Sequence, residues 1–233
     1  MKLGFPLKRR VALLFLMLIF AAPAWAHGVQ GRDAAFLKQS QGSQLGPFLY
    51  LGAKHMVTGY DHLLFLVGVI FFLYRLKDVA IYVTCFAVGH SITLLTGVLA
   101  GLHVNPYLVD ALIGLSVVYK ALDNLDGFRT LVGFGINAKA AVFGFGLIHG
   151  FGLATKLQDF ELSRQGLIGN IVAFNVGVEL GQILALSIIL AFMLRWRSRP
   201  GFLEHAVAAN VLLMTAGFVL MGYQLTGYAI GAL

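Results

Sequence analysis

The stretch LYLGAKHMVTGYDHLLFLVGVIFFLY, residues 49–74, decides the fold, because it is long and apolar enough to cross a bilayer. It nevertheless contains His55, Asp61 and His62, and ionisable groups in such segments usually belong to a site or a pathway. In a continuous helix the two histidines lie about 20° apart, with Asp61 about 100° from His62. These ligand types suit divalent zinc, nickel, cobalt or copper. The plainer interpretation is two helix-packing histidines and an interfacial aspartate.

The overall composition indicates a membrane protein with several spans. Of the 233 residues, 59% are hydrophobic and 12% are charged, against about 25% charged in a soluble domain. The 28 glycines are typical of closely packed membrane helices. Four basic residues lie in the first ten positions, so the net charge of +7 does not indicate nucleic acid as a partner. The only cysteine is Cys85, which excludes an intramolecular disulfide and a cysteine-based metal cluster.

The N-terminal residues 1–26 have the pattern of a secretory signal peptide. Basic residues precede the apolar run 11–22, and Ala24-Trp25-Ala26 forms an A-x-A cleavage site. An uncleaved anchor helix is the alternative. Cleavage leaves His27 as the first mature residue, whose amine and imidazole could chelate a metal, and whether His27 acts as a ligand stays open. Residues 27–48 are predicted to be a short exported segment.

The remaining residues, 49–233, are predicted to form an all-α, polytopic bundle of transmembrane helices. The six expected spans are residues 49–74, 79–101, 106–122, 138–156, 166–194 and 202–229. With an exported mature N-terminus, the cytoplasmic loops carry eight basic residues against five in the exported segments, as the positive-inside rule requires. This predicts a multi-pass protein of the bacterial inner membrane. The bilayer is its expected partner, and a homo-oligomer stays open.

Several polar side chains fall at the same depth in these spans. His62, His90, His149 and Glu179 lie about eleven to thirteen residues into their spans, near the bilayer midplane. Asn175, Glu179 and Gln182 are expected on one face of a helix. The predicted metal site therefore contains His55, Asp61, His62, His90, His149 and Glu179. Interhelical hydrogen bonding is the plainer interpretation for His90 or His149 taken singly, and Asp110 is interpreted as interfacial.

Glycine patterns add two hypotheses about helix packing. The four glycines at positions 144, 146, 150 and 152 surround His149, which indicates either a locally unwound helix or small-xxx-small packing. The run Phe-Ala-Val-Gly at residues 86–89 is echoed by Phe-Asn-Val-Gly at residues 174–177. These runs lie in the second and fifth spans, which correspond to each other in a three-plus-three inverted repeat.

The signal peptide, the six spans and the motif His55-x5-Asp61-His62 resemble the HupE/UreJ family of bacterial membrane proteins. Members are associated with hydrogenase and urease clusters and are regarded as nickel or cobalt permeases. The resemblance implies that His55, Asp61 and His62 bind metal. The family's second motif, a Phe-His-Gly run followed by a second His-Gly and a Glu, is matched here only by Ile148-His149-Gly150.

Three classes of function are compatible with these residues. The first is a secondary permease that carries a divalent transition-metal ion as its substrate, with no organic cofactor. The second is an intramembrane zinc hydrolase that uses the same histidines and aspartate together with Ser91. The third is a membrane metal sensor or an accessory subunit of a larger complex.

Overall fold

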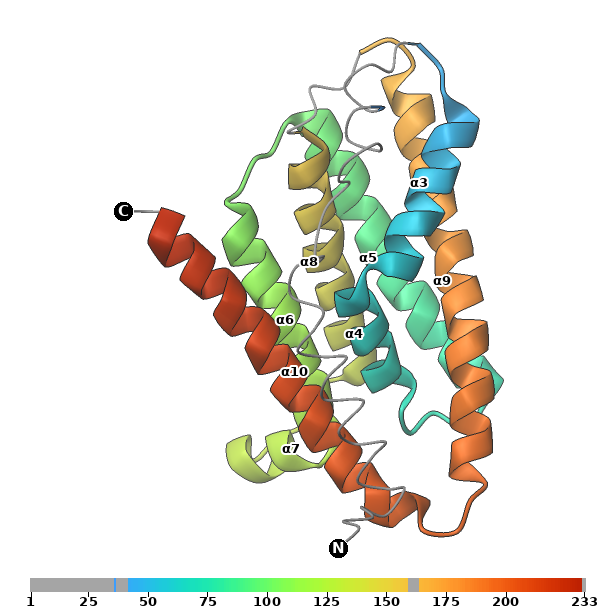
Figure 1. Cartoon of the computed structure of the whole chain (residues 1–233), viewed down its shortest axis with the longest axis vertical. Coiled ribbons are helices and arrows are strands. Elements are labelled where there is room, and N and C mark those ends of the chain that lie inside the picture. The colour runs from blue at the N-terminus through green and yellow to red at the C-terminus, as the bar shows by residue number, and fades with distance from the viewer. Residues whose placement is uncertain (1–35, 37–41, 159–163, 232–233) are drawn as a thin grey trace, which may run out of the picture.

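The computed structural model describes residue 36, residues 42–158 and residues 164–231 (Figure 1). The predicted signal peptide, its cleavage site and His27 lie outside the described residues. Within those ranges every regular element is a helix, which agrees with the predicted all-α class. The helices are α3 (Leu45–Thr58), α4 (Tyr60–Ile70), α5 (Leu76–Ala100), α6 (Pro106–Asn124), α7 (Gly127–Val132), α8 (Ala138–Gln158), α9 (Leu167–Arg197) and α10 (Phe202–Gly231).

Four of these helices, α5, α8, α9 and α10, are long and apolar enough to cross a membrane. They coincide with four of the predicted spans to within a few residues. Helix α6 occupies the predicted span 106–122, but it carries Asp110, Lys120 and Asp123 and is less apolar than the others. The described chain is therefore a helical membrane protein with four clear candidate spans, and the arrangement of six spans stays a prediction.

The first predicted span is two helices and not one. Helix α3 ends at Thr58 and α4 begins at Tyr60, because Gly59 between them takes an extended conformation with φ −74° and ψ 94°. A Cβ atom on Gly59 would lie 3.0 Å from both the His55 carbonyl oxygen and His62 Nδ1. The prediction of a continuous helix through residues 55–62 was wrong. The break, and not helical periodicity, brings His55 and His62 together.

The bundle is built from three helix pairs, α3 with α9, α5 with α8, and α6 with α10. Glycines permit this close approach. A Cβ on Gly52 would lie 1.9 Å from the Phe174 carbonyl oxygen, and a Cβ on Gly146 would lie 2.4 Å from that of Phe86. Small-xxx-small packing is therefore confirmed for α8. The alternative of an unwound segment around His149 was wrong, because α8 is a continuous helix.

The two halves of the chain repeat one packing pattern. Gly-x-x-His runs at residues 52–55 and 146–149 pack against the Phe-x-Val-Gly runs at residues 174–177 and 86–89, respectively. Helices α3 and α9 run downwards in Figure 1, and α5 and α8 both run upwards. In the third pair, Gly114 and Gly217 face each other, each with its Cβ position within 3.1 Å of the other's carbonyl oxygen. This pattern is the one expected for an inverted three-plus-three repeat.

Helix α4 is held at its lower end by Arg197 of α9. The guanidinium donates hydrogen bonds to the carbonyl oxygens of Leu73 and Phe71 at 2.7 Å each, and to that of Ile70. Carbonyl groups at the C-terminal end of a helix have no partner within the helix, so Arg197 satisfies them. The short helix is thus fixed below by Arg197 and separated from α3 above by Gly59.

Candidate metal site

Four histidines from four helices form a cluster with His62 at its centre. The centre of the His62 ring lies 4.8 Å from that of His149, 5.1 Å from that of His55 and 6.1 Å from that of His90. His62, His90 and His149 are almost fully buried, with exposed fractions of 2%, 1% and 0%. Helices α3, α4, α5 and α8 each contribute one ring. The structure therefore brings together the four histidines that were singled out from the sequence.

These ring separations are close to those of imidazoles that share one metal ion. A metal–nitrogen bond places a ring centre about 3.2 Å from the ion, so two rings at 90–110° lie about 4.5–5.2 Å apart. The separations of His62 from His149 and His55 fall in that range. In the part of the chain that the structure describes, however, no three His, Cys, Asp or Glu side chains form a ready-made metal site. Coordination would require the rings to rotate and His90 to move closer.

Asp61 orients the central histidine. Its Oδ1 lies 3.0 Å from His62 Nδ1, and both side chains are buried. An ionised carboxylate only accepts hydrogen bonds, so Nδ1 carries the proton and the lone pair is on Nε2. His62 Nε2 is buried and makes no hydrogen bond within the described residues. This carboxylate–histidine arrangement is the one that holds metal-binding imidazoles in proteins.

Ser116 of α6 plays a similar part for His149. Its hydroxyl donates to the Ile113 carbonyl oxygen at 2.6 Å, so its oxygen can accept a hydrogen bond from His149 Nε2 at 3.2 Å. His149 then carries its proton on Nε2 and its lone pair on Nδ1. Ser116 was not among the predicted residues, because a single serine in an apolar span gives no distinctive sequence signal.

His90 is positioned by the close contact between α5 and α8. A Cβ on Gly150 would lie 2.1 Å from the His90 carbonyl oxygen, and Thr93 donates to the Leu147 carbonyl oxygen at 2.6 Å. Asn175 of α9 interacts with the His90 ring through its side chain, although neither ring nitrogen makes a hydrogen bond of ordinary geometry within the described residues. Buried polar atoms are rarely left unsatisfied in proteins. The buried lone pair of His62 Nε2 is therefore available to bind a ligand.

Phenylalanines enclose the histidines. Phe86 lies 5.1 Å from His149 between ring centres, Phe65 lies 5.3 Å from His149, and Phe174 lies 6.2 Å from His55. All three phenylalanines are fully buried. They exclude water from the cluster, which strengthens the interaction of any bound cation with the nearby carboxylate of Asp61.

Comparison with protein families settles the family of this chain. The family model described as HupE/UreJ protein matches residues 31–232. The chain belongs to the HupE/UreJ family. Membership confirms the resemblance noted from the sequence and agrees with the apolar, membrane-length helices of the structure. No curated protein and no solved structure matched the chain.

Glu179 does not join the histidines of this HupE/UreJ protein. Asn175 and Gln182 are buried on α9, as expected, but Glu179 lies on the exposed face of the helix. At 100° per residue, Glu179 is displaced about 40° from Asn175 and about 60° from Gln182. The expectation that Glu179 faces the same cavity was wrong, because depth along a span does not fix the direction of a side chain.

Ser91, the candidate nucleophile of the hydrolase hypothesis, bonds to its own helix and to α9. Its hydroxyl donates to the Ala87 carbonyl oxygen at 2.7 Å and accepts from Asn175 Nδ2 at 2.7 Å. The side chain thus bridges α5 and α9. Both of these hydrogen bonds hold the hydroxyl in a structural role.

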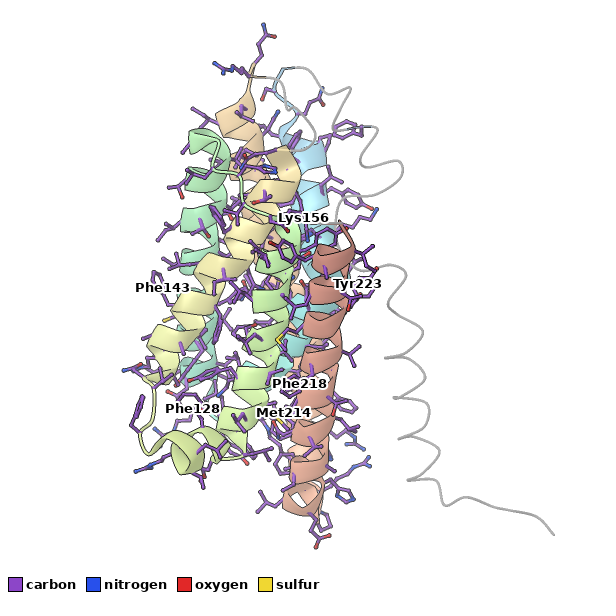
Figure 2. All side chains as sticks on the ribbon, turned by 90° about the vertical axis from the view of Figure 1, so that its left-hand side faces the viewer. Phe128, Phe143, Lys156, Met214, Phe218 and Tyr223 are labelled. Carbon is purple, nitrogen blue, oxygen red and sulfur yellow. The ribbon has the colours of Figure 1, made fainter. Side chains whose placement is uncertain are left out.

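A buried ion pair near the upper end of the bundle escaped the sequence analysis. Lys156 Nζ donates to both carboxylate oxygens of Asp110 at 2.8 Å, and only 5% of the Asp110 side chain is exposed. The Asp110 carboxylate, which the sequence indicated as interfacial, is therefore enclosed by the bundle and paired with a lysine of another helix. One signal was available, because Lys156 follows His149 by seven residues and so lies on the same face of α8. Figure 2 shows Lys156 on the upper part of α8, near α6 and α10.

Proposed function

We propose that this protein is a secondary permease for a divalent transition-metal ion, with nickel or cobalt as the favoured substrate. The observation that carries the proposal is the group of four histidines around His62, which sits inside a membrane protein of this family. Imidazole nitrogens are good ligands for such ions and can replace the water that the ion loses.

Asp61 offsets part of the charge of the ion. A divalent cation surrounded only by neutral groups in an apolar interior would carry a large desolvation cost. Asp61 supplies a buried negative charge one hydrogen bond away from the His62 ring. It also keeps the lone pair of His62 on Nε2, the nitrogen that the proposal assigns to the metal.

The break at Gly59 supports the proposal of a transport path. Discontinuous helices form ion sites in many transporters, because the ends of half-helices present backbone dipoles near the middle of the membrane. The C-terminal end of α3, which has a partial negative charge, lies beside His55. The N-terminal turn of α4 carries Asp61 and His62. A divalent ion would thus pass the point at which the first span changes direction.

The proposed orientation places the lower end of Figure 1 in the cytoplasm. That end carries Arg75 and Arg199 in connections between helices and Arg129 in the short helix α7, and basic segments outside the spans favour the cytoplasmic side. The mature N-terminus is then exported, and the membrane is the bacterial inner membrane. An inside-negative potential contributes about 4.6 kcal/mol per 100 mV to the inward movement of a divalent ion.

Enclosure of the cluster favours an ion over a larger substrate. An intramembrane hydrolase must admit a lipid or a peptide to its metal, whereas His62, His90 and His149 are surrounded by helices and phenylalanine rings. A desolvated ion needs only small rearrangements to enter such a site. The hydrolase remains the alternative that the experiment must separate from transport.

The test is uptake of nickel and cobalt into proteoliposomes that contain the full chain. His62→Ala should abolish accumulation, because every other ring of the cluster meets the His62 ring. The matched control is His205→Ala, since His205 is exposed near the start of α10. The proposal fails if His62→Ala accumulates metal like the parent. If His62→Ala instead loses a tightly bound zinc and a lipid-cleaving activity, the hydrolase replaces it.

A further inference from the structure

Neither residue of the ion pair between Asp110 and Lys156 belongs to the histidine cluster. Lys156 belongs to α8 and Asp110 to α6, so the pair bridges two helices. One ammonium group occupies both carboxylate oxygens of Asp110 at 2.8 Å. Lys156 retains a small exposed fraction of 17%, whereas Asp110 is buried.

The pair lies above His149, which shares α8 with Lys156, and above Ser116, which shares α6 with Asp110. Lys156 is seven residues after His149, which corresponds to two turns and about 10 Å along α8. Asp110 is six residues before Ser116, whose hydroxyl bonds to His149. The electrostatic influence of Lys156 extends weakly to His55, and that of Asp110 extends weakly to Tyr60, the residue before Asp61. An ion that enters from the upper end would approach the histidines from the side on which this pair lies.

Stability is a weak explanation for such a pair. Burying two charges costs about as much free energy as their attraction returns, and replacement by apolar side chains is often neutral. A lysine inside a membrane segment is costly and usually functional. Lys120 offers a contrast, because it pairs with Asp123 on its own helix, three residues away. The pair between Asp110 and Lys156 instead links two helices, α6 and α8.

We propose that Lys156 is a tethered counter-ion that an incoming divalent cation displaces from Asp110. Asp110 is then an outer metal-binding residue, and Lys156 sets the affinity of that outer position. This inference rests on the permease function proposed above. The ligand class is a divalent metal cation, for which a carboxylate is a stronger partner than for a monovalent ammonium group.

The side chains suit this exchange. The four-carbon stem of lysine is flexible and its charge is a compact point, so the ammonium can swing away while the backbone stays in place. Its partial exposure provides a direction in which to move. Once displaced, its positive charge repels the bound cation. The cation is thus driven from Asp110 towards the histidines.

The experiment measures the affinity of the purified full chain for Ni²⁺ by competition with a chromophoric chelator, and the initial rate of Ni²⁺ uptake into proteoliposomes. Lys156→Gln should tighten Ni²⁺ binding by about tenfold or more, because it removes a positive charge and frees the Asp110 carboxylate. Asp110→Asn should weaken binding and slow uptake at low Ni²⁺. Lys156→Arg keeps the charge and makes a two-pronged pair with Asp110, so it should weaken binding severalfold. The matched control is Lys54→Gln, an exposed lysine of α3 on the same half of the bundle, which should stay within twofold of the parent.

The outcomes separate this inference from the function on which it rests. Unchanged Ni²⁺ affinity in both Lys156→Gln and Lys156→Arg would overturn the counter-ion inference. Weaker Ni²⁺ binding in Lys156→Gln would also overturn it, because a pair with a purely structural role would lose Ni²⁺ affinity in every variant. The thermal unfolding midpoint of each variant shows whether it is folded. If Lys156→Gln does not fold, the Ni²⁺ affinity of Lys156→Arg decides whether the counter-ion inference holds. His62→Ala in the same assay tests the permease itself. If His62→Ala abolishes binding while the Lys156 variants match the parent, only the counter-ion inference fails.

Discussion

Gly150→Ala should separate α5 from α8 and destroy the alignment of the metal site. The new Cβ would lie 2.1 Å from the His90 carbonyl oxygen and 2.5 Å from Thr93 Oγ1. Ordinary contact requires the first of these distances to grow by at least about 1.3 Å. A backbone carbonyl cannot rotate away as a side chain can. The helices must therefore move apart, and His90 moves with them.

The expected magnitudes follow from the size of this shift. His90 must already move towards the other rings to share an ion with them. A shift of more than about 1 Å away from α8 prevents this, because metal–ligand distances tolerate only about 0.2 Å. Nickel affinity should fall by about tenfold or more. Overpacking costs about 1–3 kcal/mol, while replacing glycine with alanine inside a helix returns up to about 1 kcal/mol. The protein should therefore remain folded, with a slightly lower unfolding midpoint.

Gly144→Ala is the matched control on the same helix. Nothing lies within 4 Å of a Cβ at this position, so the substitution should raise helix stability slightly and leave nickel affinity unchanged. The assay is equilibrium competition for Ni²⁺ with the two purified variants, together with thermal unfolding. If Gly150→Ala binds nickel within twofold of Gly144→Ala, the site does not depend on the contact between α5 and α8.

Three further substitutions and one mapping experiment extend these tests. Asp61→Asn should abolish uptake while leaving the protein folded, because an amide brings no negative charge to the ion; parent-like uptake would exclude Asp61 from the site. Ser116→Ala should weaken nickel affinity about tenfold, through loss of the hydrogen bond that orients His149, and unchanged affinity would show that the bond has no such role. Arg197→Ala should lower the free energy of unfolding by about 2–3 kcal/mol, because three carbonyl groups beside α4 lose their donor, and a denaturant titration with no change would contradict this. N-terminal sequencing of the mature protein should begin at His27, and reporter fusions should place the loop at residues 198–201 in the cytoplasm; a sequence that begins at Met1 or an exported loop would contradict the topology.

Hydropathy alone located the helices well. The predicted spans 79–101, 138–156, 166–194 and 202–229 match α5, α8, α9 and α10 to within a few residues. Long apolar segments leave few alternatives to a helix in a bilayer, because every backbone group must bond within its own segment. The break at Gly59 was missed, since a glycine in an apolar run is equally compatible with a continuous helix and with a change of direction.

The residues of the candidate site were predictable only in part. Equal depth along the spans identified His62, His90 and His149 correctly as neighbours. Depth carries no information about which way a side chain points around its helix axis, and so Glu179 was included although it lies on the exposed face. That direction depends on which helices are neighbours. Here the neighbours are set by glycine contacts such as those of Gly52 and Gly146.

The ion pair between Asp110 and Lys156 shows what a single sequence leaves out. Each residue lies near the predicted end of a span, where an interfacial charge is unremarkable. Their pairing follows only from the packing of α6 beside α8. This packing brings two charged groups that are 46 positions apart in the sequence to 2.8 Å from each other. The same packing delivers Ser116 to His149.

The most direct measurement is the nickel K-edge X-ray absorption spectrum of the purified full chain loaded with one equivalent of Ni²⁺. A shared histidine site predicts at least three imidazole nitrogens at about 2.0–2.2 Å, with no sulfur in the coordination shell. The imidazole scattering should disappear in His62→Ala. Nickel coordinated by water and carboxylate oxygens alone, or a spectrum that is the same in His62→Ala as in the parent, would contradict a metal site built around His62.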